Sequence, residues 1–226
     1  LEESDLGADG DPDAKFRKAI FWSHFLDLQY LFSYPVLRRT GLFIAFYWLV
    51  ANFIGLAFFG FAKELYPDVA KGGVTTASSW MFVVIGAGLI LGSLLVSILT
   101  RKGNELRLSL IGGAMLAVGF IAMGTLAPES FPWFSAVAVV GFASSFFVVP
   151  LNAHLQDQID EDHRGRVLSA QNLMNSLSGV LAIATSSLMK LVGLSVSMQT
   201  LLFVPLIIMA TIFLRRMPTV YARKFV

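Results

Sequence analysis

The densest group of charged side chains lies between residues 157 and 166, where acids, a histidine and two arginines follow one another (DQIDEDHRGR). Carboxylates and imidazole are metal ligands, so a metal site is the first chemistry to consider. The spacing matches neither an HExxH zinc motif nor an EF-hand loop. We therefore predict a solvated, self-neutralising loop without a metal, in which Gly165 allows a tight reversal. Arg164 and Arg166 either anchor the loop at the headgroups or pair with acids at neighbouring helix ends and so hold one conformation, and Asp157 belongs to the same cytoplasmic gate.

A second group of polar side chains interrupts long apolar stretches of the chain. Only one of them, His154, can ionise; it could carry a proton or contact an anionic headgroup, or it could be a hydrated histidine at the end of a helix. Gln171, Asn175 and Ser178 recur at helical spacing and can share one face. The residues predicted to line a path through the protein are Asn52, Asn152, His154, Gln156, Gln171 and Asn175.

Cysteine is absent from the 226 residues, which excludes disulfides, thiolate metal sites and thiol catalysis. The chain is 56% hydrophobic and only 14% charged, whereas a soluble domain is roughly one quarter charged. The net charge of +2 gives no indication of nucleic-acid binding. No pair of acids or histidines is placed for catalysis within an apolar stretch, so we expect neither an enzyme nor a cofactor.

Six apolar blocks are long enough to cross a bilayer, which takes about 20 residues of helix. They predict an all-α, polytopic membrane protein with six transmembrane helices. The fifth block is the most polar, and its polar face should meet other helices or water rather than lipid. The blocks cover residues 40–62, 72–100, 108–127, 133–156, 167–189 and 196–214.

The loops indicate the orientation of these spans. If the N-terminus is cytoplasmic, 14 of the 17 Lys and Arg residues fall on the cytoplasmic side. We therefore expect a bacterial inner-membrane protein with both termini in the cytoplasm. The expected organisation is a disordered acidic linker (1–14), a cytoplasmic amphipathic segment (15–39), the six-helix bundle (40–214) and a basic tail (215–226). The amphipathic segment either lies on the membrane surface or packs on the cytoplasmic ends of the bundle.

Small residues indicate where spans touch. Gly88 and Gly92 form a GxxxG spacing in the second block (GAGLILGS). Such spacing allows two helix backbones to approach closely. The stripe serves either as plain packing or as a sliding surface between moving helices.

Two loop sequences resemble those of the major facilitator superfamily. RGRV, which opens the fifth block, is similar to the family's loop before its eleventh helix, and TRKGNELR (100–107) resembles its basic loop between helices eight and nine. The second departs from the family pattern, because Thr100 and Arg101 stand where an Asp-Arg pair is expected. The resemblance implies the C-terminal half of a twelve-helix transporter, with Arg101 and Lys102 joining the cytoplasmic gate.

Longer segments resemble one branch of that family, the lysophospholipid transporters. They are FFVVPLNAHLQ, RGRVLSAQNLMN and GLILGSLLVSILTRKGNELRL. The resemblance implies alternating access, a lysophospholipid substrate, membrane lipids around the bundle, a missing N-terminal six-helix half, and an acyltransferase as a fused domain or partner. The alternatives are a transporter of a drug or metabolite and a membrane scaffold that transports nothing. Because the chain starts at Leu1, we expect a fragment of a longer protein.

Overall fold

The computed structural model describes residues 18–66 and 72–217, and every regular element in these two segments is a helix. The expected linker (1–14) and most of the expected basic tail lie outside them. Six of the helices are long and apolar enough to span a membrane, so the predicted all-α fold with six spans is confirmed. In chain order the elements are α1 (Lys18–Ser33), α2 (Pro35–Leu65), α3 (Gly72–Leu99), α4 (Glu105–Thr125), α5 (Phe131–Asp157), the short 3₁₀ helix η2 (Glu161–His163), α6 (Arg164–Leu191) and α7 (Val196–Arg215).

Proline and serine define several helix ends. α1 ends at Ser33 and α2 begins at Pro35, after the extended residue Tyr34. A proline has no amide hydrogen to donate and disfavours helical backbone in the residue before it, so the break falls there. The first spanning helix therefore begins before Thr40 and includes the arginines at 38 and 39. Ser130 and Ser195 cap α5 and α7, where their hydroxyls accept from backbone amides three residues on.

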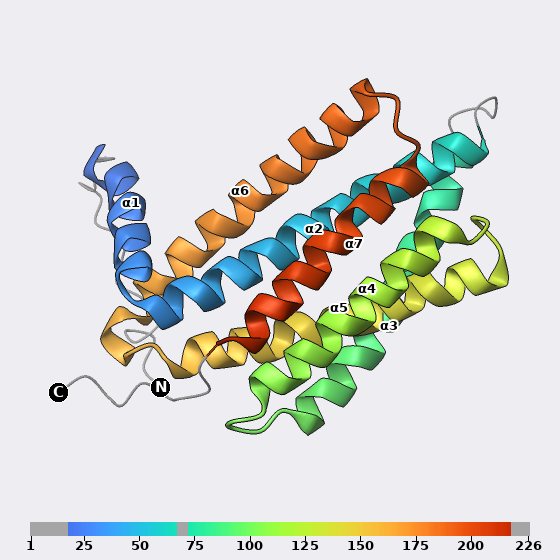
Figure 1. Ribbon diagram of the computed structural model, residues 1–226. Helices are drawn as coiled ribbons and strands as arrows, with labels where there is room; N and C mark the ends of the chain where they lie inside the picture. The colour runs from blue at the N-terminus through green and yellow to red at the C-terminus, as the bar shows by residue number, and fades with distance from the viewer. Residues whose placement is uncertain (1–17, 67–71, 218–226) are drawn as a thin grey trace, which may run out of the picture.

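The spans form two parts: α3, α4, α5 and α7 pack together, and α6 lies at the edge of the bundle (Figure 1). α5 packs between α3 and α4, and α4 packs on α7. α2 contacts α3, α5, α6 and α7, so it joins the two parts. α6 packs mainly on α2 and α1, and Figure 1 shows it apart from α3, α4 and α5. One long side of α6 is thus left uncovered by the described helices.

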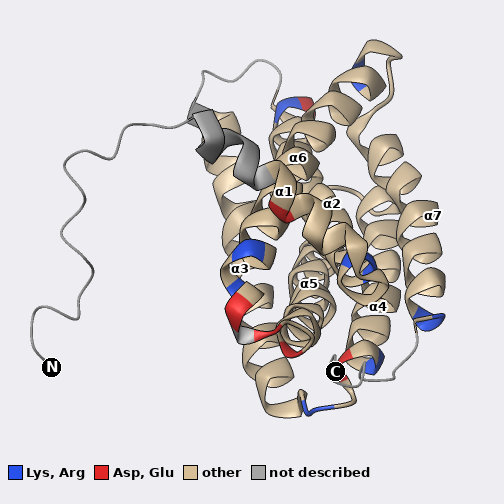
Figure 2. Ribbon diagram, turned by 90° about the vertical axis from the view of Figure 1, so that its left-hand side faces the viewer, with Lys and Arg blue, Asp and Glu red and all other residues tan. Residues whose placement is uncertain are grey.

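Charged residues gather at the helix ends and in the connections, and long stretches of helix between them carry none (Figure 2). We call one end of the bundle the basic end; it includes Arg101, Lys102, Arg164, Arg166 and Arg215. The other, the far end, includes Lys63, Glu129 and Lys190. Large apolar side chains on the sides of the spans are exposed, among them Ile90, Leu94 and Ile98 on α3. An apolar belt between two charged ends is the surface of an integral membrane protein.

The GxxxG spacing on α3 lies against α5. A Cβ atom on Gly88 would collide with the Ala138 carbonyl oxygen and the Phe142 backbone, and one on Gly92 would lie 2.5 Å from the Phe142 carbonyl oxygen. Ser93 and Ser145 add a hydrogen bond of 3.0 Å across the same contact. The two helix backbones therefore touch without intervening side chains, as small residues allow in membranes.

Candidate functional site

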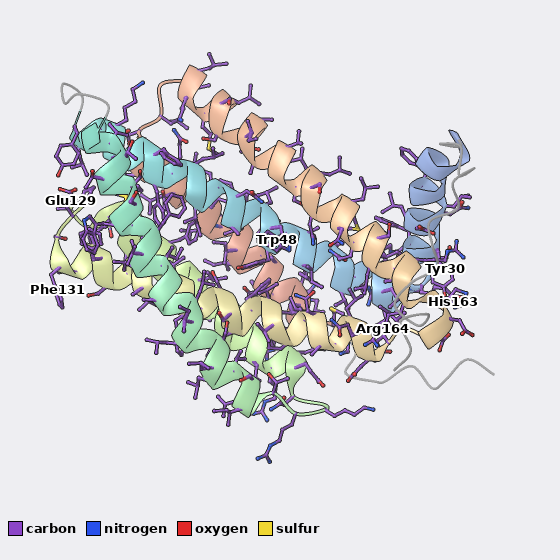
Figure 3. All side chains as sticks on the ribbon, turned by 180° about the vertical axis from the view of Figure 1, so that it is seen from behind. Tyr30, Trp48, Glu129, Phe131, His163 and Arg164 are labelled. Carbon is purple, nitrogen blue, oxygen red and sulfur yellow. The ribbon has the colours of Figure 1, made fainter. Side chains whose placement is uncertain are left out.

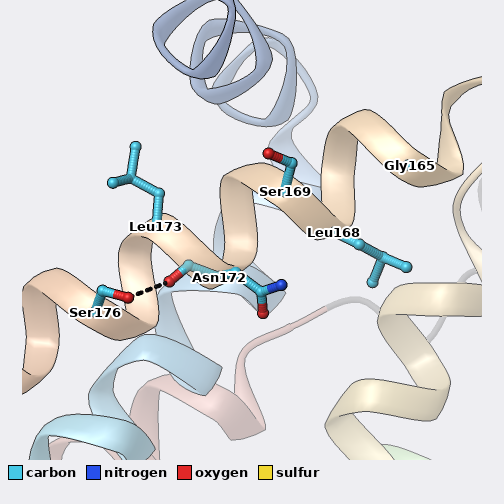
Figure 4. A pocket seen from close by; sticks show the side chains of 6 residues that line it. All are labelled: Gly165, Leu168, Ser169, Asn172, Leu173 and Ser176. Atoms are coloured by element: carbon cyan, nitrogen blue, oxygen red, sulfur yellow. Dashed lines mark hydrogen bonds between the residues drawn. The ribbon is translucent and has the colours of Figure 1, made fainter. Parts of the chain in front are cut away.

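A row of polar side chains runs along the uncovered side of α6. Ser169, Asn172 and Ser176, which we call the α6 stripe, line an open hollow of about 500 Å³ together with Gly165, Leu168 and Leu173 (Figure 4). The Ser176 hydroxyl donates to the Asn172 backbone carbonyl at 3.0 Å. The Asn172 side-chain amide is exposed and makes no hydrogen bond to any described residue. It is free to bind a ligand that enters the hollow.

A second polar group, the α2–α6 amide cluster, joins the two helices beside the stripe. Its members are Trp48 and Asn52 on α2 and Gln171 and Asn175 on α6. The Asn52 amide donates to the Trp48 backbone carbonyl at 2.7 Å, and it faces Gly179, where an added Cβ would lie 3.6 Å from it. A Cβ at position 179 would make only ordinary van der Waals contact with Asn52, so α2 and α6 pack closely at this level.

Asn175 links the two helices through its side-chain amide. The hydrogen bonds around Asn175 are best satisfied when its side-chain oxygen accepts from the Trp48 indole nitrogen at 3.1 Å. Its side-chain nitrogen then donates to the Gln171 backbone carbonyl oxygen at 3.2 Å. The side-chain amides of Asn175 and Gln171 contact each other at 2.8 Å. The Trp48 indole, midway along the bundle in Figure 3, is thus the donor that ties α2 to the polar side of α6.

Gln171 is the buried member of this cluster, with 3% of its surface exposed. Its Nε2 lies 3.3 Å from the Gly41 carbonyl oxygen, and Gly41 has no side chain that would prevent this approach. Its Oε1 is buried and has no hydrogen-bond partner among the described residues. A buried polar atom without a partner is uncommon and favours a role beyond packing.

The three predicted residues of α5 do not form one surface. Asn152 donates to the Val148 carbonyl of its own helix at 3.0 Å. His154 is buried, its two ring nitrogens have no hydrogen-bond partner among the described residues, and Glu105 and Asp157 are close enough to act on it electrostatically. Gln156 is exposed and accepts a long contact of 3.5 Å from Arg164. Residues two apart on a helix point about 200° apart, so His154 faces away from Asn152 and Gln156, which are four residues apart and lie on one side of α5.

The charged loop before α6 attaches α1 to the bundle. Arg166 forms an ion pair of 2.8 Å with Asp27 of α1, and its guanidinium lies 5.2 Å from the centre of the Tyr30 ring. His163 stacks on the same ring at 4.7 Å, and Figure 3 shows Tyr30 and His163 side by side. Burial, followed by the hydrogen bond with Tyr34, raises the pKa of Tyr30 above its usual value, so the phenol stays neutral. We call Asp27, Tyr30, His163 and Arg166 the α1 clasp.

The reversal predicted at Gly165 does not occur there. Gly165 lies inside the first turn of α6, its φ is not positive, and a Cβ at this position would meet nothing within 4 Å. Residues 158–163, including η2, make the turn instead. In the described segments no three Asp, Glu or His side chains are placed to share a metal ion.

Arg101 and Lys102 are exposed in the connection between α3 and α4 at the basic end. Side chains of this connection hold its backbone: Asn104 accepts from the Arg101 amide at 2.7 Å and donates to the Leu99 carbonyl at 2.8 Å. Glu105 accepts from the Gly103 amide at 2.8 Å, and Gly103 has a φ of 99°. Thr100, which replaces the expected acid, donates to the Val96 carbonyl of its own helix at 2.6 Å.

The sequence pattern therefore predicted only some of the residues that form the candidate site. Asn52, Gln171 and Asn175 belong to one cluster that Trp48 joins, whereas on α5 the buried His154 faces away from Asn152 and Gln156. Trp48, Gly41, Asp27 and Tyr30 were not predicted. A glycine or an aromatic residue among apolar neighbours gives no signal until its partner helix is known.

Comparison with known proteins identifies the family. The model of the Major Facilitator Superfamily matches residues 4–183, from before α1 into α6. No curated protein and no solved structure matches the chain. The six-span architecture agrees with the family match. The chain therefore belongs to the major facilitator superfamily of secondary membrane transporters.

Proposed function

We propose that the six spans form one half of a transporter that works by alternating access, and that the α6 stripe and the α2–α6 amide cluster line its substrate path. The observation that carries this proposal is the polar row Ser169, Asn172 and Ser176 within a spanning helix, of which Asn172 and Ser176 are exposed and Ser169 is half-buried. Lipid has no hydrogen-bonding partner for an exposed amide, so such a face belongs against water, substrate or other helices. A second six-helix half would enclose it, and rocking of the halves would open it to each side in turn.

The proposed orientation places the basic end in the cytoplasm of a bacterial cell, with the far end outside the inner membrane. The excess of Lys and Arg at the basic end supports this orientation. The gate would then close at the basic end, around Arg101, Lys102, Asp157, Arg164 and Arg166.

The substrate class we propose is a lysophospholipid. The path has amides and hydroxyls that can bind a glycerol backbone, and Leu168 and Leu173 beside them can contact an acyl chain. Arg164, exposed at the basic end of the same helix, can pair with a phosphate. The resemblance of three segments to the lysophospholipid transporter group, which comes from the sequence alone, is the other ground for this substrate class.

The test is transbilayer movement of a fluorescent lysophosphatidylethanolamine by the protein in its natural full length, reconstituted into proteoliposomes. We expect Asn172→Leu to slow movement at least about tenfold, because it removes hydrogen bonds to the bound headgroup, each worth about 1 kcal/mol or more. The matched control is Ser97→Leu, an exposed serine of α3 that bonds only to its own helix; movement should be unchanged.

Three results would correct the proposal at different levels. Movement of a drug or metabolite but of no lysolipid refutes the substrate class and leaves alternating access intact. Full activity of Asn172→Leu refutes the α6 stripe as the path. A protein that moves none of these compounds is a scaffold.

A further inference from the structure

An acidic side chain at the far end is held in a fixed position by a tyrosine. Tyr66, which follows the last turn of α2, donates its hydroxyl to both carboxylate oxygens of Glu129, at 2.9 and 2.8 Å. Glu129 has a φ of 65°, a left-handed conformation that is uncommon for a residue with a side chain. Such conformations persist where surrounding contacts impose them, and they cluster at ligand sites. Glu129 lies at the opposite end of the bundle from Tyr30 and His163 (Figure 3).

Glu129 lines a hollow of about 360 Å³ whose other walls are apolar. Ala77, Trp80 and Val84 of α3 and Phe134 of α5 complete the lining. Trp80 is 62% exposed and also lines a second hollow of about 250 Å³. The second hollow is lined by hydroxyl-bearing side chains, Thr75, Thr76 and Ser79, and by Val83. The indole therefore stands between an acidic hollow and a hydroxyl-lined one.

A carboxylate beside an indole is suited to one chemical class, a cation with apolar surroundings. Among the described residues, no Lys, Arg or His nitrogen lies within the 4.0 Å of Glu129 that defines an ion pair. Tyr66 fixes the carboxylate by donating a neutral hydrogen bond, so the negative charge is kept. An ammonium group would gain the carboxylate's charge and the electron-rich face of Trp80 together.

The position of the hollow indicates a lipid as the source of that ammonium. Below Trp80, α3 continues toward the middle of the membrane with exposed apolar side chains, including Val83, Ile90 and Leu94. Tryptophan is enriched at headgroup depth in membrane proteins, and Trp80 lies nearer the far end than the basic end of α3. A phospholipid at this site would lay its acyl chains on α3 and bring its headgroup to Trp80.

We propose that the hollow between Trp80 and Glu129 binds the ammonium headgroup of a phospholipid from the leaflet at the far end. The headgroup's phosphate lies toward Thr75, Thr76 and Ser79, on the other side of the indole. The site is separate from the α6 stripe and does not depend on the proposed transport activity.

The test is native mass spectrometry of the full-length protein purified in detergent and mixed with equal amounts of phosphatidylethanolamine and phosphatidylglycerol. We expect the wild-type protein to retain phosphatidylethanolamine about fivefold more than phosphatidylglycerol, a preference typical of one partly exposed ion pair and one cation–π contact. Glu129→Gln should bring the ratio close to one, and Trp80→Leu should lower it. The control is Phe131→Leu, an aromatic residue near Glu129 that is 85% exposed and does not line the hollow; its ratio should equal that of the wild type.

A second arm changes the lipid instead of the protein, so it does not depend on the folding of a variant. Phosphatidylethanolamine with an acetylated, uncharged nitrogen should bind wild-type protein no better than phosphatidylglycerol does. Free ethanolamine should not displace the intact lipid, because it lacks the acyl chains. Equal retention of the acetylated lipid, displacement by ethanolamine, or an unchanged ratio in Glu129→Gln would each overturn the proposal.

Discussion

Replacing Gly88 by alanine tests whether α3 and α5 touch through their backbones. The new methyl group would overlap the Ala138 carbonyl oxygen and the Phe142 amide, which are helix backbone and cannot rotate away. Overpacking of this kind costs about 1–3 kcal/mol. Alanine also raises helix propensity by about 1 kcal/mol over glycine, which offsets part of the loss.

Gly86 provides the matched control, because it lies two residues away on the same helix and a Cβ there would meet nothing within 4 Å. Gly86→Ala gains the same propensity without the collision, so the difference between the two variants isolates the collision. We expect Gly88→Ala to be less stable than Gly86→Ala by about 1–3 kcal/mol. Reversible unfolding in mixed detergent micelles, followed by tryptophan fluorescence, measures this difference. Equal stability of the two variants would refute the backbone contact between α3 and α5.

Three further predictions concern the two ends of the bundle. A double-mutant cycle of Asp27→Ala and Arg166→Ala should show a coupling of about 1 kcal/mol in the free energy of unfolding. The value is modest because Asp27 is largely buried but Arg166 is half exposed. If the two single losses simply add, the ion pair contributes nothing to stability. Arg164→Ala should lower transport in proteoliposomes while expression stays normal, and unchanged transport would leave Arg164 as a membrane anchor only. The hydrogen bond to Glu129 raises the pKa of Tyr66, so the folded state holds this proton more tightly than the unfolded state; the bond's contribution is complete below about pH 10 and is lost as the pH rises through the raised pKa. The titration of Tyr66 alone is the phenolate absorbance of a protein minus that of the same protein carrying Tyr66→Phe. This difference should titrate at higher pH in the wild-type background than in the Glu129→Gln background. Identical titrations in the two backgrounds would contradict the hydrogen bond.

The spans could be predicted because a bilayer leaves few choices for the chain. A charge-free run such as 76–100 must be helical if it crosses lipid, whatever its neighbours are. The start of α2 was less certain: Arg38 and Arg39 suggested that the span began at Thr40, but basic side chains can reach the interface from inside a spanning helix. Pro35, which has a fixed effect on the backbone, was the more reliable signal.

The sequence could predict only those contacts of the candidate site that lie within one helix, where helical periodicity places two side chains on the same face. Gln171 and Asn175 are four residues apart and meet on one face, as their spacing indicates. The contacts that complete the site join distant parts of the chain: Arg166 and Asp27 are 139 residues apart, and Tyr66 and Glu129 are 63 apart. Such pairs depend on how helices pack, and periodicity within one helix carries no information about its partner.

Chemical labelling of single cysteines tests the central claim, that the α6 stripe faces a watery substrate path. The sequence contains no cysteine, so Asn172→Cys and Leu91→Cys can each be the only thiol in this region. Both positions are exposed, and each lies eight residues from the end of its helix at the basic end, Asn172 on α6 and Leu91 on α3.

In membranes containing the full-length protein, a small hydrophilic thiol reagent should modify the cysteine at position 172, and bound substrate should slow that reaction. The same reagent should leave the cysteine at position 91, which faces lipid, unmodified. An unreactive cysteine at position 172, or equal reactivity at the two positions, would contradict the assignment of the α6 stripe as the transport path.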